Sequence, residues 1–337
     1  MDREQQELQF LGFFGIFKET FKIVFSWRKI FSQITLALIL PLSFIFLAHL
    51  HISQVILMNI QSNFDKENDY NFQNNSPSYT KIKNSISTQW VAFWSFKVAY
   101  FVFLVIFSLL STAAVVYTIA CIYTAKQISF KKVMSVVPKV WKRLMVTFLW
   151  SFAIVFVYNL VAIGFIILAI LLIGVVPILG FILSILFLIG YLSGFVYIGI
   201  IWHLASVVSV LEDVYGIKAM KKSRNLIKGK KGLAVAFFVL LAVCFGGIEF
   251  MYEDFVVLGS DGEMGIRIGI GIVCFLLLLT VILFGLVIQT IIYFVCKSYH
   301  HENIDKPSLS EHLEAYLGDY VRLRGPKDVQ LGETDHV

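Results

Sequence analysis

Six long apolar runs dominate the sequence and limit what the chain can fold into. A helix needs about 20 apolar residues to cross about 30 Å of hydrocarbon, and inside lipid every backbone polar group must find its partner within the chain. The runs therefore predict an all-α fold, a polytopic transmembrane helical bundle with six spans. The predicted spans are 30–50, 98–123, 144–173, 177–208, 233–251 and 265–296.

Charged residues are scarce and lie in short blocks between the apolar runs. The 337 residues are 58% hydrophobic and 15% charged, with a formal net charge of +6, whereas a soluble globular chain is about one quarter charged. Basic blocks beside apolar runs favour anionic lipid headgroups over nucleic acid as the partner. We therefore expect membrane lipids as partners and no nucleic-acid binding.

Lysine and arginine alternate along the chain in the way that orients membrane spans. Residues 1–29, 124–143, 210–232 and the tail 297–337 hold five, six, seven and five of them. Basic residues collect on the cytosolic side of a membrane. Both termini are therefore predicted to be cytosolic, with a membrane domain over 30–296 between them. The endoplasmic reticulum and the plasma membrane both fit this pattern.

The connection between the first two spans, residues 51–97, differs in composition from the spans. Residues 61–85 within it are rich in asparagine, serine and charge, which is typical of a mobile segment. We expect a loop on the lumenal or extracellular side. Asn74 opens a glycosylation sequon there, and Pro77, which directly follows the sequon, would hinder the modification.

Three segments of similar design each precede a pair of predicted spans. Residues 15–31, 128–144 and 216–233 alternate apolar residues at helical spacing with lysine or arginine. Such a segment fits an amphipathic helix in the membrane interface, with its ammonium groups toward the headgroups. The pattern indicates a threefold repeat of interfacial helix and hairpin, although basic cytosolic loops without shared ancestry would look similar. The predicted units are 13–97, 128–208 and 216–296.

The basic residues of these segments are the candidate lipid-binding residues. A basic residue near an anionic membrane surface contributes about 1 kcal/mol. In the first segment the predicted apolar stripe consists of Phe14, Phe17, Phe21, Val24 and Phe25. The predicted headgroup contacts are Lys18, Lys22, Arg28, Lys29, Lys131, Lys132, Lys142, Arg143, Lys218, Lys221, Lys222, Arg224 and Lys228.

The third segment contains a short motif at the entrance of a span. Residues 212–229 read EDVYGIKAMKKSRNLIKG, in which an acidic residue and a glycine precede the matching residues. The motif resembles a signature of multi-pass proteins that include the membrane domain attached to some bacterial glycerophosphodiester phosphodiesterases. The sequence has no counterpart of their catalytic domain, so the resemblance implies a membrane fold without the esterase activity. The matching residues are Ala219, Lys221, Lys222, Ser223, Leu226, Lys228 and Gly229.

The N-terminal segment FLGFFGIFKE, residues 10–19, supports a second resemblance. Together with the hydropathy profile, it is similar to uncharacterised plant six-span membrane proteins. Some of those proteins carry a label for binding a polyadenylate-binding protein, and we place no expectation on that label.

Few polar side chains lie within the predicted spans. A transporter driven by ions usually needs ionisable groups deep in the membrane, and His203 is the main candidate, with Asn159 and Gln289 as uncharged companions. These three residues form the predicted intramembrane polar site. A proton relay through His203 is one interpretation, and a histidine that packs by hydrogen bonding is the other.

Two pairs of glycines have the spacing that permits close approach of helices. Gly190 and Gly194 lie in the fourth predicted span, and Gly265 and Gly269 lie near the entrance of the sixth. Packing within the bundle is the favoured interpretation for the first pair, and a homodimer is the alternative.

No pattern of residues predicts a catalytic, cofactor or metal site. Ser193 has no convincing partner base, and the tail histidines 300, 301 and 312 lack acidic or thiol ligands. The cysteines at 121, 244, 274 and 296 have no paired spacing, so they predict neither a disulfide framework nor a zinc site. The cytosolic tail could bind protein partners through its hydrophobic terminus.

These observations favour a non-enzymatic multi-pass membrane protein that organises lipids or partner proteins at the cytosolic leaflet. The alternative is a transporter or facilitator of an apolar or lipid-like solute, which needs a cavity among the spans. An enzyme that acts on lipids is disfavoured, because no catalytic constellation is present.

Overall fold

The chain folds into helices, as the apolar runs predict. The computed structural model describes residues 10–70, 77–124, 128–259 and 264–300, and these ranges contain no strand. Six of the described helices are long and apolar enough to cross a membrane. The elements are α2 (Phe13–Ser26), α3 (Arg28–Ile34), the π-helix η1 (Thr35–Ile39), α4 (Leu40–Tyr70), α5 (Pro77–Tyr123), α6 (Phe130–Val175), α7 (Pro177–Leu211), α8 (Ile217–Leu226), α9 (Lys231–Tyr252), the π-helix η2 (Glu253–Val257) and α10 (Met264–Tyr299).

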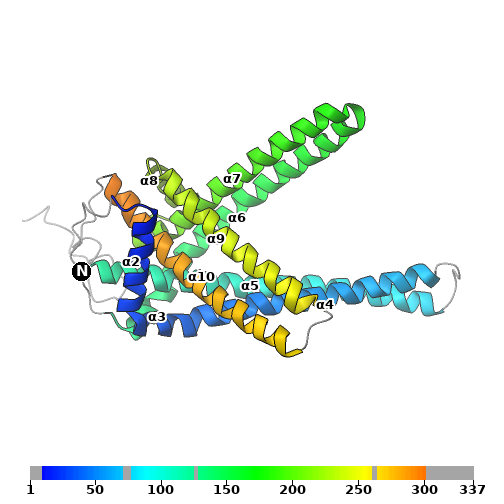
Figure 1. Cartoon of the computed structure of the whole chain (residues 1–337), viewed down its shortest axis with the longest axis horizontal. Helices are drawn as coiled ribbons and strands as arrows, with labels where there is room; N and C mark the ends of the chain where they lie inside the picture. The colour runs from blue at the N-terminus through cyan, green and yellow to red at the C-terminus, as the bar shows by residue number, and fades with distance from the viewer. Residues whose placement is uncertain (1–9, 71–76, 125–127, 260–263, 301–337) are drawn as a thin grey trace, which may run out of the picture.

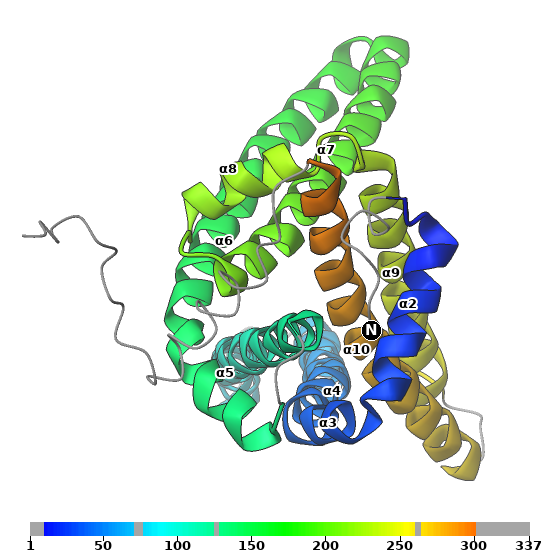
Figure 2. The ribbon, with the colours of Figure 1, turned by 90° about the vertical axis from the view of Figure 1, so that its left-hand side faces the viewer.

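The long helices pair into three hairpins, α4–α5, α6–α7 and α9–α10. Figure 1 shows that the hairpins meet at one end of the molecule and diverge from it. We call this end the convergent end; it comprises α2, α3, α8, the first turns of α6 and the last turns of α10. Figure 2 looks onto this end, where α2 lies beside α9 and α10, and α8 lies beside α6 and α7.

The main core lies where the hairpins meet. Its largest contributions come from the last turns of α5, α7 and α10, and it also takes in the protein-facing sides of α2 and α8. Helices that are apolar on every side are buried when other helices surround them, and residues 111–121 of α5 are buried without a break. Away from this end, each helix packs against fewer neighbouring helices.

The α6–α7 hairpin projects away from the other helices (Figure 1). The separation of the predicted spans 144–173 and 177–208 is confirmed: α6 ends at Val175, and Pro177 begins α7, where its missing N–H costs nothing. The outer side chains are exposed, with 63% of Leu171 and 78% of Ile178 accessible. Apolar side chains with this exposure require lipid, rather than water, around the hairpin.

The prediction of a loop over residues 51–97 is wrong, because most of this connection is helical. Helix α4 continues to Tyr70 and α5 already begins at Pro77, so most of this connection is a helical extension of the first hairpin. Ile60 and Phe93 are buried along it, and the Asn63 amide donates to Gln89 Oε1 at 3.0 Å. The polar composition of this connection led to the prediction of a loop, whereas the residues form two helices that hydrogen-bond to each other. Asn74 lies outside the described residues.

The three amphipathic segments adopt two different structures. α2 and α8 are separate short helices, but residues 130–144 are continuous with the span of α6, which differs from the predicted separate interfacial helix. Pro138 lies inside α6 and cannot donate to the carbonyl four residues earlier. Val133, Val136 and Val140 of this segment are buried, so its apolar face contacts protein. Common ancestry of the three units stays a prediction.

The stripe predicted on α2 is divided between protein and the outside. The Phe17 ring lies 5.2 Å from the Phe237 ring of α9, and the Phe21 ring lies 4.8 Å from the Phe284 ring of α10. Phe14 and Phe25 are exposed instead, at 84% and 65%. One side of α2 thus fixes it to the third hairpin, and the other side is available to lipid.

Gly194 and Gly190 give a matched test of how α6 and α7 pack. A Cβ added at Gly194 would lie 2.5 Å from the Tyr158 hydroxyl, which donates to the Tyr191 carbonyl at 2.8 Å, whereas a Cβ at Gly190 meets nothing within 4 Å. Close helix approach at Gly194 is thus a packing contact within the chain. At Gly265 and Gly269 an added Cβ meets no described atom within 4 Å, so none of the described helices approaches these glycines closely.

We predict that Gly194→Ala is less stable than Gly190→Ala by about 1–3 kcal/mol, because overpacking costs that much and both variants gain the same helix propensity. The free energy of unfolding in detergent micelles measures the difference. Equal unfolding midpoints for the two variants would contradict the packing contact.

Candidate functional site

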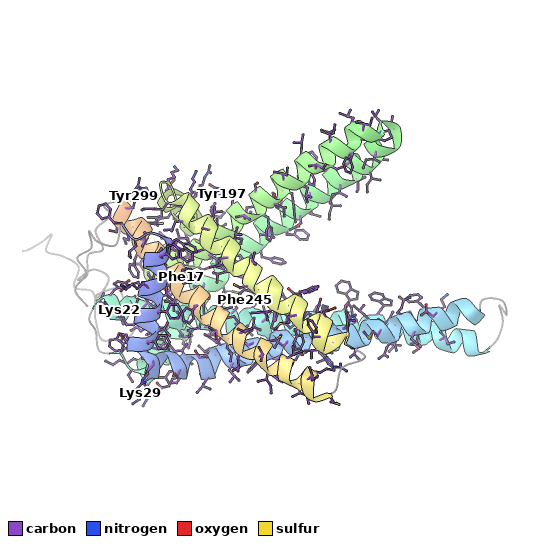
Figure 3. All side chains as sticks on the ribbon, viewed as in Figure 1. Phe17, Lys22, Lys29, Tyr197, Phe245 and Tyr299 are labelled. Carbon is purple, nitrogen blue, oxygen red and sulfur yellow. The ribbon has the colours of Figure 1, made fainter. Side chains whose placement is uncertain are left out.

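Basic side chains gather at the convergent end. Figure 3 shows Lys22 and Lys29 there, and places Phe245 farther along α9. Two of the predicted headgroup contacts, Arg143 and Lys222, form ion pairs within the protein, so they are not free for lipid. The remaining predicted contacts are exposed, namely Lys18, Lys22, Arg28, Lys29, Lys131, Lys132, Lys142, Lys218, Lys221, Arg224 and Lys228. Their contact with headgroups stays a prediction.

Glu212 joins three helices at this end. It follows directly after α7, and its side chain is 13% exposed. Lys222 Nζ of α8 lies 2.6 Å from Glu212 Oε2. On the other oxygen, Oε1, the Tyr293 hydroxyl of α10 donates at 2.6 Å and Lys297 Nζ donates at 3.2 Å. One carboxylate therefore fixes the position of α8 against the ends of α7 and α10.

The surroundings of Glu212 favour its charged form. Burial acts to raise the pKa of the carboxyl group, but the hydrogen bonds from Lys222 and Tyr293 and the charges of Lys297 and Lys222 outweigh burial, so the pKa lies below its usual value. Charge-assisted bonds of this kind are stronger than neutral ones. The neighbouring lysines in the sequence are only part of this arrangement, because Tyr293 and Lys297 come from 81 and 85 residues away.

Two further contacts hold α8 in place. The backbone N–H of Gly216, a residue with φ of 63°, donates to Thr147 Oγ1 of α6 at 2.8 Å. The Ser223 hydroxyl donates to the Ile201 carbonyl of α7 at 2.9 Å. The motif over 212–229 therefore builds the junction between hairpins. Sequence reasoning missed Thr147, since nothing near it in the chain indicates a bond to a glycine 69 residues away.

An open basic pocket lies between α8 and the end of α10. His300 Nε2 donates to the Leu226 carbonyl at 3.0 Å, which closes one side of the pocket. Gly229 has a φ of 96° and lies against the Tyr299 ring, so a larger residue would not fit this turn. The pocket has a volume of about 600 Å³. Its lining residues are Lys221, Lys222, Asn225, Leu226, Lys228 and His300.

A second, apolar cavity lies among the hairpins. It has a volume of about 410 Å³ and is lined by residues of α4, α5, α7, α9 and α10. Its polar lining residues are Ser108, His203 and Gln289, and His203 Nδ1 lies 2.8 Å from Gln289 Oε1. Asn159 is elsewhere: its Oδ1 accepts from the Tyr191 hydroxyl at 2.9 Å, within the α6–α7 hairpin. Only two of the three predicted polar residues therefore share a site.

The arrangement has no group of three or more metal-ligating side chains among the described residues. The cysteines at 121, 244, 274 and 296 are free thiols in the structure. The predicted histidines 301 and 312 and the tail that was expected to bind partners lie outside the described residues.

Six apolar helices arranged as hairpins define the class of an integral multi-pass membrane protein. The chain belongs to a family whose model, described as "Domain of unknown function (DUF8558)", matches residues 1–334. No curated protein and no solved structure matches the chain. The resemblances to the phosphodiesterase membrane domain and to plant six-span proteins stay predictions.

We predict that Glu212 makes the stability of the protein depend on pH. Because the folded pKa lies below the usual value of 4.5, the stabilisation is present above pH 4.5 and is lost as the pH falls through the folded pKa. Glu212→Gln should lack this dependence and should unfold more easily at pH 7 by about 1–3 kcal/mol. Unfolding in detergent between pH 3 and pH 7 measures both effects.

Asp213→Asn is the matched control. Its ion pair with Arg143 at 3.0 Å is exposed, and such pairs contribute about 0–1 kcal/mol. If Glu212→Gln and the wild-type protein lost stability in parallel on acidification, the stabilising role of Glu212 would be refuted.

Proposed function

We propose that the protein is a non-enzymatic membrane protein that binds anionic lipid headgroups at the convergent end and thereby organises lipids in the cytosolic leaflet. The basic pocket between α8 and α10 supports this proposal most directly. An ammonium group attracts a phosphate or carboxylate as a compact point charge. The pocket offers such groups beside the ends of two apolar helices, where headgroups of the surrounding lipid would lie.

The charges in the pocket differ in how far they are neutralised. Lys222 forms an ion pair with Glu212, so its charge is largely neutralised within the protein. Lys221 and Lys228 are exposed, and neither has an acidic partner among the described residues. Two ammonium groups in one pocket, neither paired with an acid within the described part of the chain, favour an anion as the ligand.

The surroundings of the pocket favour a lipid as the source of that anion. α2 presents Phe14 and Phe25 outward at the same end of the molecule, and exposed aromatic rings next to lysines are typical of helices that lie in the interface. The distribution of lysine and arginine along the sequence supports a cytosolic location for this end. The cytosolic leaflet carries the anionic lipids.

The apolar cavity favours the alternative, transfer of an apolar or lipid-like solute. A solute pathway needs space among the spans, and the cavity supplies space lined by uncharged residues. Lipid organisation and solute transfer are separate functions. Transfer first requires that the solute binds in the cavity.

We predict that Lys221→Gln/Lys228→Gln binds short-chain phosphatidylserine about thirtyfold more weakly than the wild-type protein, because each of the two ammonium groups contributes about 1 kcal/mol near an anionic headgroup. Calorimetric titration of the full-length protein in neutral detergent measures the affinity, with short-chain phosphatidylcholine as the uncharged reference. The matched control is Lys131→Gln/Lys132→Gln, which removes the same charge from α6 outside the pocket. Equal losses in the two double variants would reject the pocket, and no loss in either would reject headgroup binding.

A further inference from the structure

We propose that the apolar cavity binds one molecule of an uncharged lipid that carries a free hydroxyl group, and that this hydroxyl donates a hydrogen bond to Nε2 of His203. The sterol and diacylglycerol classes both have this chemistry. The site goes beyond headgroup binding at the convergent end, since it uses other residues and needs no charge on the ligand.

The size and lining of the cavity fit the apolar body of such a lipid. Its volume of about 410 Å³ lies within the range of about 300–1,000 Å³ that small-molecule sites occupy. Phe46 of α4, Leu104 of α5, Phe238 and Phe245 of α9 and Val281 of α10 are among the lining residues. Together with His203 of α7, these side chains come from all three hairpins, so the cavity lies between hairpins rather than inside one.

His203 provides a polar group that the protein leaves without a full set of partners. His203 lines the cavity and is exposed, although it lies within a membrane span. Nδ1 is bonded to Gln289 Oε1 at 2.8 Å. No described residue bonds to Nε2. A polar nitrogen that faces an apolar cavity without a partner is costly, so this atom favours a ligand with a complementary group.

The bond to Gln289 determines which complementary group is needed. An amide oxygen only accepts hydrogen bonds, so Nδ1 must be the donor. No acidic side chain lines the cavity, and an imidazole in apolar surroundings without a counter-charge is neutral. A neutral imidazole that donates from Nδ1 accepts at Nε2. The ligand must therefore donate, and a hydroxyl group is the donor that neutral lipids have.

The depth of this pair excludes a charged headgroup as the ligand. His203 lies eight residues before Leu211, the end of α7, and Gln289 lies eight residues before Lys297. At a rise of 1.5 Å per residue, both side chains lie about 12 Å from the level of the Glu212 cluster. The cavity lining contains no lysine or arginine. A phosphate at this depth would be an unpaired charge in hydrocarbon, whereas a single hydroxyl would be satisfied by His203.

Photo-crosslinking to the purified full-length protein in nanodiscs tests this proposal. The probes are a diazirine-bearing sterol, a diazirine-bearing diacylglycerol and, as the reference, a diazirine-bearing phosphatidylcholine. We expect one of the two hydroxylated probes to label α9 or α10 saturably, with competition by the unlabelled lipid. The methyl ether of that lipid should compete about fivefold less well, since a net hydrogen bond accounts for a change of this size.

Substitutions assign the effect to the cavity. His203→Phe should weaken labelling by the hydroxylated probe about fivefold and remove the difference between lipid and methyl ether. Ala242→Phe should weaken labelling, because Ala242 lines the cavity and a phenyl ring there occupies part of the space that the ligand needs. Ser193→Ala is the matched control, since Ser193 lies on α7 outside the cavity and bonds only to its own helix.

Several results would overturn the proposal. These are labelling that does not saturate, labelling by phosphatidylcholine as strong as that by the hydroxylated probes, and equal competition by lipid and methyl ether. The methyl-ether comparison uses the wild-type protein, so it holds even if a variant fails to fold. Lys221→Gln/Lys228→Gln should leave the labelling unchanged, which separates this site from headgroup binding.

Discussion

Contact with lipid along six apolar helices is the constraint on which the rest of the structure depends. In the most apolar 18-residue stretch of α6, only 6% of the residues are buried within the protein, and the share is the same in α7. Hairpins with so few protein neighbours keep their backbone hydrogen bonds because each helix satisfies its own. Acyl chains, rather than other helices, must therefore cover most of the surface, and specific protein contacts are concentrated where the hairpins meet.

The convergent end consequently determines how the hairpins are arranged. Glu212 draws Lys222, Tyr293 and Lys297 together, and the Gly216 N–H bonds to Thr147. These contacts connect α6, α7, α8 and α10 at the convergent end. The same contacts pair Lys222 and Lys297 with Glu212, whereas Lys221 and Lys228 have no acidic partner among the described residues. The apolar cavity lies farther along the helices and is lined by all three hairpins.

The sequence predicts those features that depend on local composition. Length and hydropathy were sufficient for the six spans and for the separation of the third span from the fourth, because crossing lipid limits the length of each span. The same reasoning failed over 51–97, where polar residues occur in helices that bond across the hairpin through Asn63 and Gln89. It also grouped Asn159 with His203, because hydropathy does not show which helix a polar side chain will meet.

The two sites differ in how far they could have been predicted. The basic segments could be recognised in the sequence as clusters of lysine and arginine. The sequence did not show which of these cations form ion pairs, because Glu212 bonds to residues of two other helices, α8 and α10. The cavity left no signal in the sequence. Its lining comes from five helices, and an apolar residue beside a void has the same composition as one that is fully packed.

Accessibility of nitroxide labels in nanodiscs tests the central claim most directly. Single labels at Leu168, Leu171 and Ile182 of the α6–α7 hairpin, where 51%, 63% and 50% of each side chain is exposed, are compared with a label at Lys228. The account predicts that dissolved oxygen reaches the hairpin labels while a water-soluble nickel chelate does not, and that the chelate reaches position 228. A chelate that reached the hairpin as readily as Lys228 would contradict it.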